Sequence, residues 1–312
     1  MKKILKITAI SLLILGLVFL IGFTIFVGKS FFDGFTNASP REETKKNMAY
    51  FQEDYDKFKA DHDIKELEIQ SSKFDHKIAL IHVDEGNEDL AVLIHGLGTS
   101  KESMAKQAQV FLDLGFDVIM YDQRNAGDNM ADYSTFGVLE SYDALDVLSY
   151  ARENVGQGEI LLFGESYGGA TALIGAARDA RNIDYMVLDS PLGDGMYMME
   201  DTLAKIEKDT GLPQEFMVFA ANIYTKMKLD FTLDDINSAE WIKDKNFDFP
   251  VLIINSQEDQ VTPPAMVKEI YDNLKTDKKE IHTEESGGHA NLIKEDYEKF
   301  KGIIEGFLEK YR

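Results

Sequence analysis

The sequence predicts an α/β protein in which a mostly parallel sheet carries helices on both faces. Short, continuously apolar runs alternate with longer stretches of helical periodicity, and this alternation is typical of a parallel sheet. The length of 312 residues accommodates one such domain of about 250 residues, or two smaller ones. The strands are expected at residues 118–121, 160–163, 185–188, 251–254 and 280–283, and the helices near residues 101–114, 138–154, 168–180, 264–275 and 291–311.

Three further strands are expected to open the sheet, at residues 67–69, 78–81 and 90–94. Their pattern passes from alternating to continuously apolar, as happens where a sheet runs from its edge to its buried centre. Ahead of them, residues 42–60 carry apolar side chains at three- or four-residue spacing and predict an amphipathic helix. The interval 191–247 is too long for a simple crossover and predicts an inserted helical cap.

The amino terminus carries an apolar segment without a charged residue, at residues 7–27. About twenty apolar residues in a helix span the roughly 30 Å of a hydrocarbon core. A cleaved signal would have a shorter apolar region and a small-residue cleavage site, so an uncleaved anchor is favoured. We therefore expect a signal anchor or transmembrane helix at residues 1–28, a short tether at residues 29–41, and the main domain at residues 42–312.

Basic residues flank the apolar segment unequally. Lys2, Lys3 and Lys6 precede it, while Lys29 and Arg41 follow it. Positive charge favours the cytoplasmic side of a membrane. The sequence therefore predicts a single-pass protein of the cell membrane with its main domain on the extracytoplasmic side.

Composition excludes several classes of chemistry. A formal net charge of −22 argues against nucleic acid as a partner, because polyanions would be repelled. The absence of cysteine excludes disulfides, cysteine-ligated zinc and a thiol nucleophile. Without a cysteine cluster or a His-x-x-x-His pair, we expect no bound metal, and a nucleophile would have to be an oxygen or a nitrogen.

A serine lies in a glycine-rich turn between a predicted strand and a predicted helix. The segment Gly164-Glu165-Ser166-Tyr167-Gly168 follows the strand at residues 160–163 and runs into small residues that begin a helix. Such a turn is strained and needs small neighbours, and it leaves the serine hydroxyl exposed above the sheet. The pattern alone is common, but its position between strand and helix identifies Ser166 as a candidate nucleophile.

A serine nucleophile requires a general base, and that base requires a carboxylate to orient it. Asp259 follows the strand at residues 251–254, and His289 lies in a glycine-rich loop after the last strand. Both therefore belong to the edge at which open α/β sheets build their sites. Glu258 and Asp189 are the competing carboxylates, and of the two we expect Asp189 to support the site or to cap the following turn.

The loop after the strand at residues 90–94 is the candidate source of an oxyanion hole. We expect the backbone N–H groups of Leu97 and of Tyr167, the residue after the nucleophile, to be the two donors. His95 is expected to brace this loop by hydrogen bonds. Asp122 and Arg124 could contact a substrate, but a structural ion pair or loop brace is favoured for both.

The chain carries Ser166, Asp259 and His289 in this order, after the segments His95-Gly96-Leu97-Gly98 and Tyr121-Asp122-Gln123-Arg124. In this combination it resembles the α/β-hydrolase superfamily over about residues 65–312. Within it, the chain resembles bacterial membrane-anchored hydrolases of the Bem46 and ABHD13-like group. The resemblance implies the α/β-hydrolase fold and hydrolysis of esters or related acyl substrates without a cofactor. One departure is Asn125-Ala126-Gly127, where a glycine-first loop is common, and it affects the expected shape of that loop.

The sequence therefore predicts a carboxylesterase-type serine hydrolase that acts on a small-molecule or lipid-like acyl substrate through an acyl-enzyme. A peptidase with the same triad is the nearest alternative, and a non-catalytic binding or scaffold protein is another. Apolar cap residues that include Met198, Phe216 and Phe219 could line an acyl pocket or simply bury the cap helices. Fold alone does not choose the substrate.

Overall fold

The computed structural model describes residues 2–155 and 158–312. The chain divides into two compact units. The first, which we call the helix unit, comprises Met1–Thr36 and Met196–Asp235. The second, the sheet unit, comprises Asn37–Gly195 and Ile236–Arg312.

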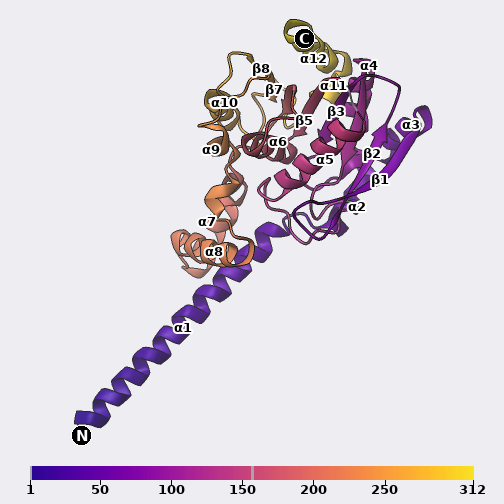
Figure 1. Ribbon diagram of the computed structural model, residues 1–312. Coiled ribbons are helices and arrows are strands. Elements are labelled where there is room, and N and C mark those ends of the chain that lie inside the picture. The colour runs from indigo at the N-terminus through magenta and orange to yellow at the C-terminus, as the bar shows by residue number, and fades with distance from the viewer. Residues whose placement is uncertain (1, 156–157) are drawn as a thin grey trace. The chain divides into compact units, whose positions relative to one another are not determined.

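The sheet unit is built on an eight-stranded sheet with the order β1-β2-β4-β3-β5-β6-β7-β8 (Figure 1). The β1–β2 and β2–β4 pairs are antiparallel, and every later pair is parallel. The expected mostly parallel sheet is therefore confirmed. The strands are β1 (Ile64–Gln70), β2 (Lys77–Val83), β3 (Asp89–Ile94), β4 (Phe116–Tyr121), β5 (Ile160–Glu165), β6 (Tyr185–Asp189), β7 (Val251–Ser256) and β8 (Lys279–Glu284).

Helices cover both faces of the sheet, and each face has its own apolar core. One core joins the sheet to α5, α6, α9 and α10, and the other joins it to α3, α4 and α12. The central strands β3, β4, β5 and β6 are almost wholly buried, which explains their continuously apolar sequences. The helices of the sheet unit are α2 (Arg41–Asn47), η1 (Met48–Tyr50), α3 (Gln52–Asp61), η2 (Lys101–Met104), α4 (Ala105–Asp113), α5 (Glu140–Asn154), α6 (Tyr167–Arg178), α9 (Ser238–Ile242), α10 (Pro264–Asn273), α11 (Leu292–Glu295) and α12 (Tyr297–Tyr311).

The stretch expected to form one amphipathic helix at residues 42–60 is broken into α2, η1 and α3. The two helices bind to different parts of the sheet unit. Arg41 in α2 donates to the carbonyls of Asn129 and Ala131, whereas Phe58 in α3 is buried in the core shared with α4. The short 3₁₀ turn between them allows each helix to follow its own surface.

The helix unit contains α1 (Lys2–Thr36), α7 (Glu200–Thr210) and α8 (Gln214–Leu229), with the short helices η3 (Gly195–Met199) and η4 (Leu233–Ile236) at the ends of its second segment. Among the described residues, one helical stretch is long and apolar enough to cross a membrane, and it is α1 with its continuation. Its large apolar side chains between residues 4 and 21 each expose more than half of their surface.

Helix α1 continues through most of the segment expected to be a tether at residues 29–41. Contacts within the helix unit explain this extension, because Phe32 packs edge-on against Tyr224 of α8 with ring centroids 5.3 Å apart. Gly28 also lies directly against the backbone of α8 at Ala220. The non-helical link between α1 and α2 is therefore confined to residues 37–40.

Candidate active site

Ser166 occupies the sharp turn between β5 and α6. Its φ of 53° and ψ of −115° are unusual for a residue with a side chain, and such strain is characteristic of functional turns. Glycines make this turn possible. A Cβ at Gly164 would lie 2.6 Å from the Gly168 carbonyl oxygen, and one at Gly168 would overlap the carbonyl of Ile94. The small residues around the serine are therefore required by the close approach of β5, α6 and β3.

His289 lies between Ser166 and Asp259. Its Nε2 atom is 2.8 Å from Ser166 Oγ, and its Nδ1 atom is 2.8 Å from Asp259 Oδ2. The loop that carries it contains Gly287 and Gly288 at positive φ, so the chain turns sharply enough to bring the imidazole over the serine. The structure thus brings together all three residues that the sequence singled out.

The loop after β7 holds Asp259 as a buried carboxylate. Its Oδ1 accepts hydrogen bonds from the N–H groups of Val261 at 2.8 Å and Thr262 at 2.9 Å. Burial opposes ionisation of Asp259, but the hydrogen bonds from His289 and Thr262 outweigh it and lower the pKa of this carboxyl. Asp259 is therefore ionised and fixed in orientation at neutral pH.

Thr262 is a supporting residue that was not among the site residues predicted from the sequence. Its hydroxyl lies 2.9 Å from Asp259 Oδ2 and 3.0 Å from the carbonyl oxygen of Ser190. It links the loop after β7 to the end of β6. The signal in the sequence is its position three residues after an aspartate at the start of a helix, where hydroxyl groups commonly hold turns together.

The competing carboxylates take other positions. Glu258 is exposed, and among the described residues no contact joins it to His289. Asp189 is buried at the end of β6, where its carbonyl accepts the N–H of Ser166 at 2.8 Å and its carboxyl lies 3.3 Å from Ser190 Oγ. Burial, reinforced by the carboxyl of Glu165, raises the pKa of Asp189 well above its ordinary value. Asp189 thus supports the turn through its backbone.

The loop after β3 lies beside the serine. A Cβ at Gly96 would be 3.7 Å from the Cβ of Ser166, and Leu97 lines the same cavity as Ser166 and His289. Tyr167 is the first residue of α6, and N–H groups there have no partner within the helix. Both expected oxyanion donors therefore belong to segments that adjoin the Ser166 side chain.

His95 braces the loop after β3. Its Nε2 accepts the N–H of Gln123 at 3.0 Å, and the Gln123 side chain donates to the His95 carbonyl at 2.6 Å. Burial lowers the pKa of His95 to about 4, so the imidazole is neutral and serves as an acceptor. This arrangement is the structural role that the sequence favoured for His95.

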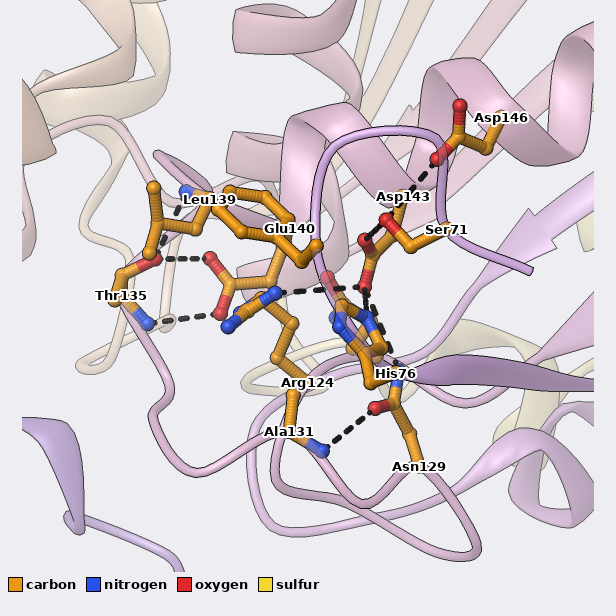
Figure 2. Close-up of polar contacts among 12 residues, drawn as sticks. Ser71, His76, Arg124, Asn129, Ala131, Thr135, Leu139, Glu140, Asp143 and Asp146 are labelled. Carbon is orange, nitrogen blue, oxygen red and sulfur yellow. Dashed lines mark hydrogen bonds and ion pairs between the residues drawn. The ribbon is translucent and has the colours of Figure 1, made fainter. Parts of the chain in front are cut away.

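Asp122 and Arg124 both take part in buried polar networks. Asp122 accepts from Lys101 Nζ at 2.8 Å, and burial raises the pKa of its carboxyl to about 6 despite that cation. Arg124 packs over the ring of Phe74 at 4.7 Å, with its Nη1 atom 4.0 Å from Asp143. Figure 2 shows that Asp143 also meets His76, at 2.8 Å. These contacts brace loops and do not involve Ser166.

The cavity at Ser166 has a volume of about 190 Å³ and a partly charged wall. Lys106 and Lys294 line it, with Lys106 Nζ 3.2 Å from the carboxylate of Asp54. Glu165, the residue before the nucleophile, accepts from Gln107 at 2.7 Å, and burial raises the pKa of its carboxyl. No local sequence pattern marks these lining residues, because they come from segments that only the fold brings together.

Known proteins resemble this chain in both sequence and fold. A family model described as the alpha/beta hydrolase fold matches residues 92–225. The Bacillus subtilis protein YqkD is 26% identical over 221 residues, which is 70% of each chain. A proline iminopeptidase of Saccharolobus solfataricus is 25% identical over 181 residues, or 57% of this chain and 54% of its own.

Solved structures share the fold. The Pyrococcus furiosus esterase Pf2001 is 21% identical and superposes with a TM-score of 0.63, over 81% of this chain and 94% of the esterase. The family model and the superposed structures agree on the α/β-hydrolase fold. The closer resemblance to the Bem46 and ABHD13-like group stays a prediction.

Proposed function

This chain belongs to the α/β-hydrolase superfamily, and we propose that it is a serine hydrolase that cleaves carboxylic esters through an acyl-enzyme on Ser166. The observation that carries the proposal is the chain of two 2.8 Å contacts from Ser166 through His289 to Asp259. A serine hydroxyl is a poor nucleophile until a base removes its proton, and this geometry supplies that base.

In the proposed reaction, Ser166 Oγ attacks the acyl carbon while His289 Nε2 takes its proton. The amides of Leu97 and Tyr167 hold the oxyanion, and His289 then returns the proton to the leaving alcohol. Water hydrolyses the acyl-enzyme by the same steps. Asp259 keeps the Nδ1 proton of His289 in place and stabilises the imidazolium. The lowered pKa of Asp259 suits this role, because it keeps the carboxylate ionised.

The cavity indicates the size of the acyl group. Pockets for drug-sized ligands hold about 300–1,000 Å³, whereas the cavity at Ser166 holds about 190 Å³. Its wall includes Lys106 and Lys294, which do not favour a long apolar chain. We therefore expect esters of short acyl groups to be better substrates than esters of long ones.

A peptidase on the same triad is the second candidate, and the similarity to a proline iminopeptidase favours it. The chemistry differs mainly in the leaving group, which would be an amine that needs protonation by His289. A non-catalytic binding protein of this fold is the third possibility. It would not turn over any substrate.

We also propose that α1 anchors the enzyme in the cell membrane as a single span. The exposed apolar surface of α1 supports this, because water would not favour so many apolar side chains in one helix. The three lysines at its amino terminus favour a cytoplasmic start, with the sheet unit on the extracytoplasmic side.

The test is a comparison of substrates with the full-length protein in detergent. We expect turnover of p-nitrophenyl acetate and butyrate, lower turnover of the decanoate and laurate, and none by Ser166→Ala. Faster cleavage of aminoacyl p-nitroanilides than of any ester would favour the peptidase. No turnover of either class by the folded wild type would contradict a hydrolase of this type.

A further inference from the structure

Helix α8 packs beside α1 (Figure 1). It also carries exposed apolar side chains next to that contact. Phe219 and Met227 are exposed over 57% and 63% of their surfaces, and Ile223 over 39%. These residues are four apart, so they form one stripe along the helix. Exposed apolar side chains that gather in this way usually mark a contact surface.

The contacts between α1 and α8 set the position of this stripe along α1. The rings of Phe23 and Phe216 stack at 5.9 Å, and further along both helices Phe32 packs on Tyr224 at 5.3 Å. From the first of these pairs to the second, the residue number increases in both α1 and α8, so the two helices run in the same direction. The amino-terminal half of α8 therefore lies beside the end of the apolar segment of α1.

A close approach holds this register. A Cβ on Gly28 would overlap the carbonyl of Ala220, so the two backbones touch at this point, as small residues allow between helices. Phe219, next to Ala220, is thus level with Val27, the last residue of the apolar segment. At a rise of 1.5 Å per residue, Ile223 lies ~6 Å and Met227 ~12 Å further from the membrane centre.

Polar side chains border this stripe. At 3.6 residues per turn, Glu215 lies one turn before Phe219 on the same side of the helix, and Lys226 lies next to the stripe on the side away from the α1 contact. The apolar surface is therefore a narrow band, which Phe219, Ile223 and Met227 form and Phe216 continues toward α1.

We propose that α8 docks on the bilayer that α1 spans, with Phe216 and Phe219 inserted at the boundary between acyl chains and headgroups. The proposal rests on the membrane anchor proposed above, because α1 places α8 at that boundary. Apolar burial drives the contact. A net charge of −22 gives the chain no general attraction to anionic lipid, so the contact persists at high salt.

The absence of native cysteine allows a direct test in the full-length chain. Single variants Phe219→Cys, Ile223→Cys and Met227→Cys are labelled with a nitroxide and reconstituted into phosphatidylcholine vesicles. Electron paramagnetic resonance then compares relaxation by oxygen, which concentrates in lipid, with relaxation by a neutral nickel chelate, which stays in water. Leu15→Cys, in the middle of α1, and Glu305→Cys, exposed on α12, give the lipid and water references.

We expect oxygen to relax the label at residue 219 more strongly than the nickel chelate does, at a depth between those of the two references. This preference for oxygen should fall at residue 223 and vanish at residue 227. The docking of α8 would be overturned, with the anchor intact, by one combination of results. In it, the nickel chelate relaxes the label at residue 219 as strongly as the label at residue 305, while the label at residue 15 shows the oxygen preference of lipid. Shielding from both reagents would overturn it in favour of contact with a second copy. A water-exposed residue 15 would overturn the anchor and the docking together.

Discussion

Asp189 and Asp259 are two buried carboxylic acids at the carboxyl ends of neighbouring strands, β6 and β7, yet their surroundings differ. Asp259 receives hydrogen bonds from Val261, Thr262 and His289, and its pKa is lowered. The carboxyl of Asp189 meets one hydroxyl, its second oxygen has no partner among the described residues, and its pKa is raised. Hydrogen-bond donors lower the pKa of Asp259, whereas burial and the nearby carboxyl of Glu165 raise that of Asp189, so two similar positions in the sheet give carboxyl groups with opposite pKa shifts.

Asp259→Asn is expected to have the largest effect on turnover. The amide keeps the shape of the side chain but cannot stabilise the imidazolium of His289, and in serine proteases the same change lowers the rate constant by roughly 10⁴. We expect a loss of about 10³ to 10⁴ in kcat on a short-chain p-nitrophenyl ester, with an unchanged circular dichroism spectrum. A variant with near-wild-type kcat would exclude Asp259 as the acid.

Thr262→Val is expected to have an intermediate effect. Valine retains the shape of threonine but removes the hydroxyl that lies 2.9 Å from Asp259 Oδ2. A hydrogen bond to a charged group contributes about 1.5–3 kcal/mol, so its loss should lower kcat roughly ten- to hundredfold. The measurement is kcat on a short-chain p-nitrophenyl ester, with circular dichroism to confirm that the variant is folded. Unchanged kcat would leave Thr262 a purely structural role.

Asp189→Asn tests the other side of the comparison and should change kcat by no more than about threefold. Its main effect should be on stability. The pKa of Asp189 is raised in the folded state, so above pH ~4 the folded protein keeps a proton on this carboxyl that the unfolded chain loses. The free energy of unfolding of the wild type therefore falls as the pH rises, by at most about 1.4 kcal/mol per pH unit from this group. Urea unfolding at pH 5 and pH 8 should show a smaller fall in the variant. An equal fall in both proteins would mean that Asp189 titrates normally.

Glu258→Gln is expected to have the smallest effect, because Glu258 is exposed and Asp259 already occupies the contact with His289. Surface substitutions usually change free energies by less than about 0.5 kcal/mol, so kcat should stay within about twofold. A large loss here, together with an active Asp259→Asn variant, would exchange the roles of the two neighbours.

Local patterns predicted Ser166, His289 and the parallel strands, because the glycines at an elbow and the apolar runs of buried strands leave direct marks in the sequence. They did not predict Thr262, Glu165 or Lys294, since the roles of these residues depend on contacts between distant segments. The helical path of α1 beyond Val27 was also missed. Its polar composition suggests a tether, and only the packing of Gly28 and Phe32 on α8 explains the helix.

The most direct test of the central claim is labelling with a fluorophosphonate probe, followed by mass spectrometry of the modified peptide. Such probes react at useful rates only with activated serines. We predict one modified residue, Ser166, in the wild type and in Asp189→Asn, much slower modification in Asp259→Asn, and none in Ser166→Ala. Modification that persists in Ser166→Ala, or a wild type that does not react, would contradict the assignment of Ser166 as the nucleophile.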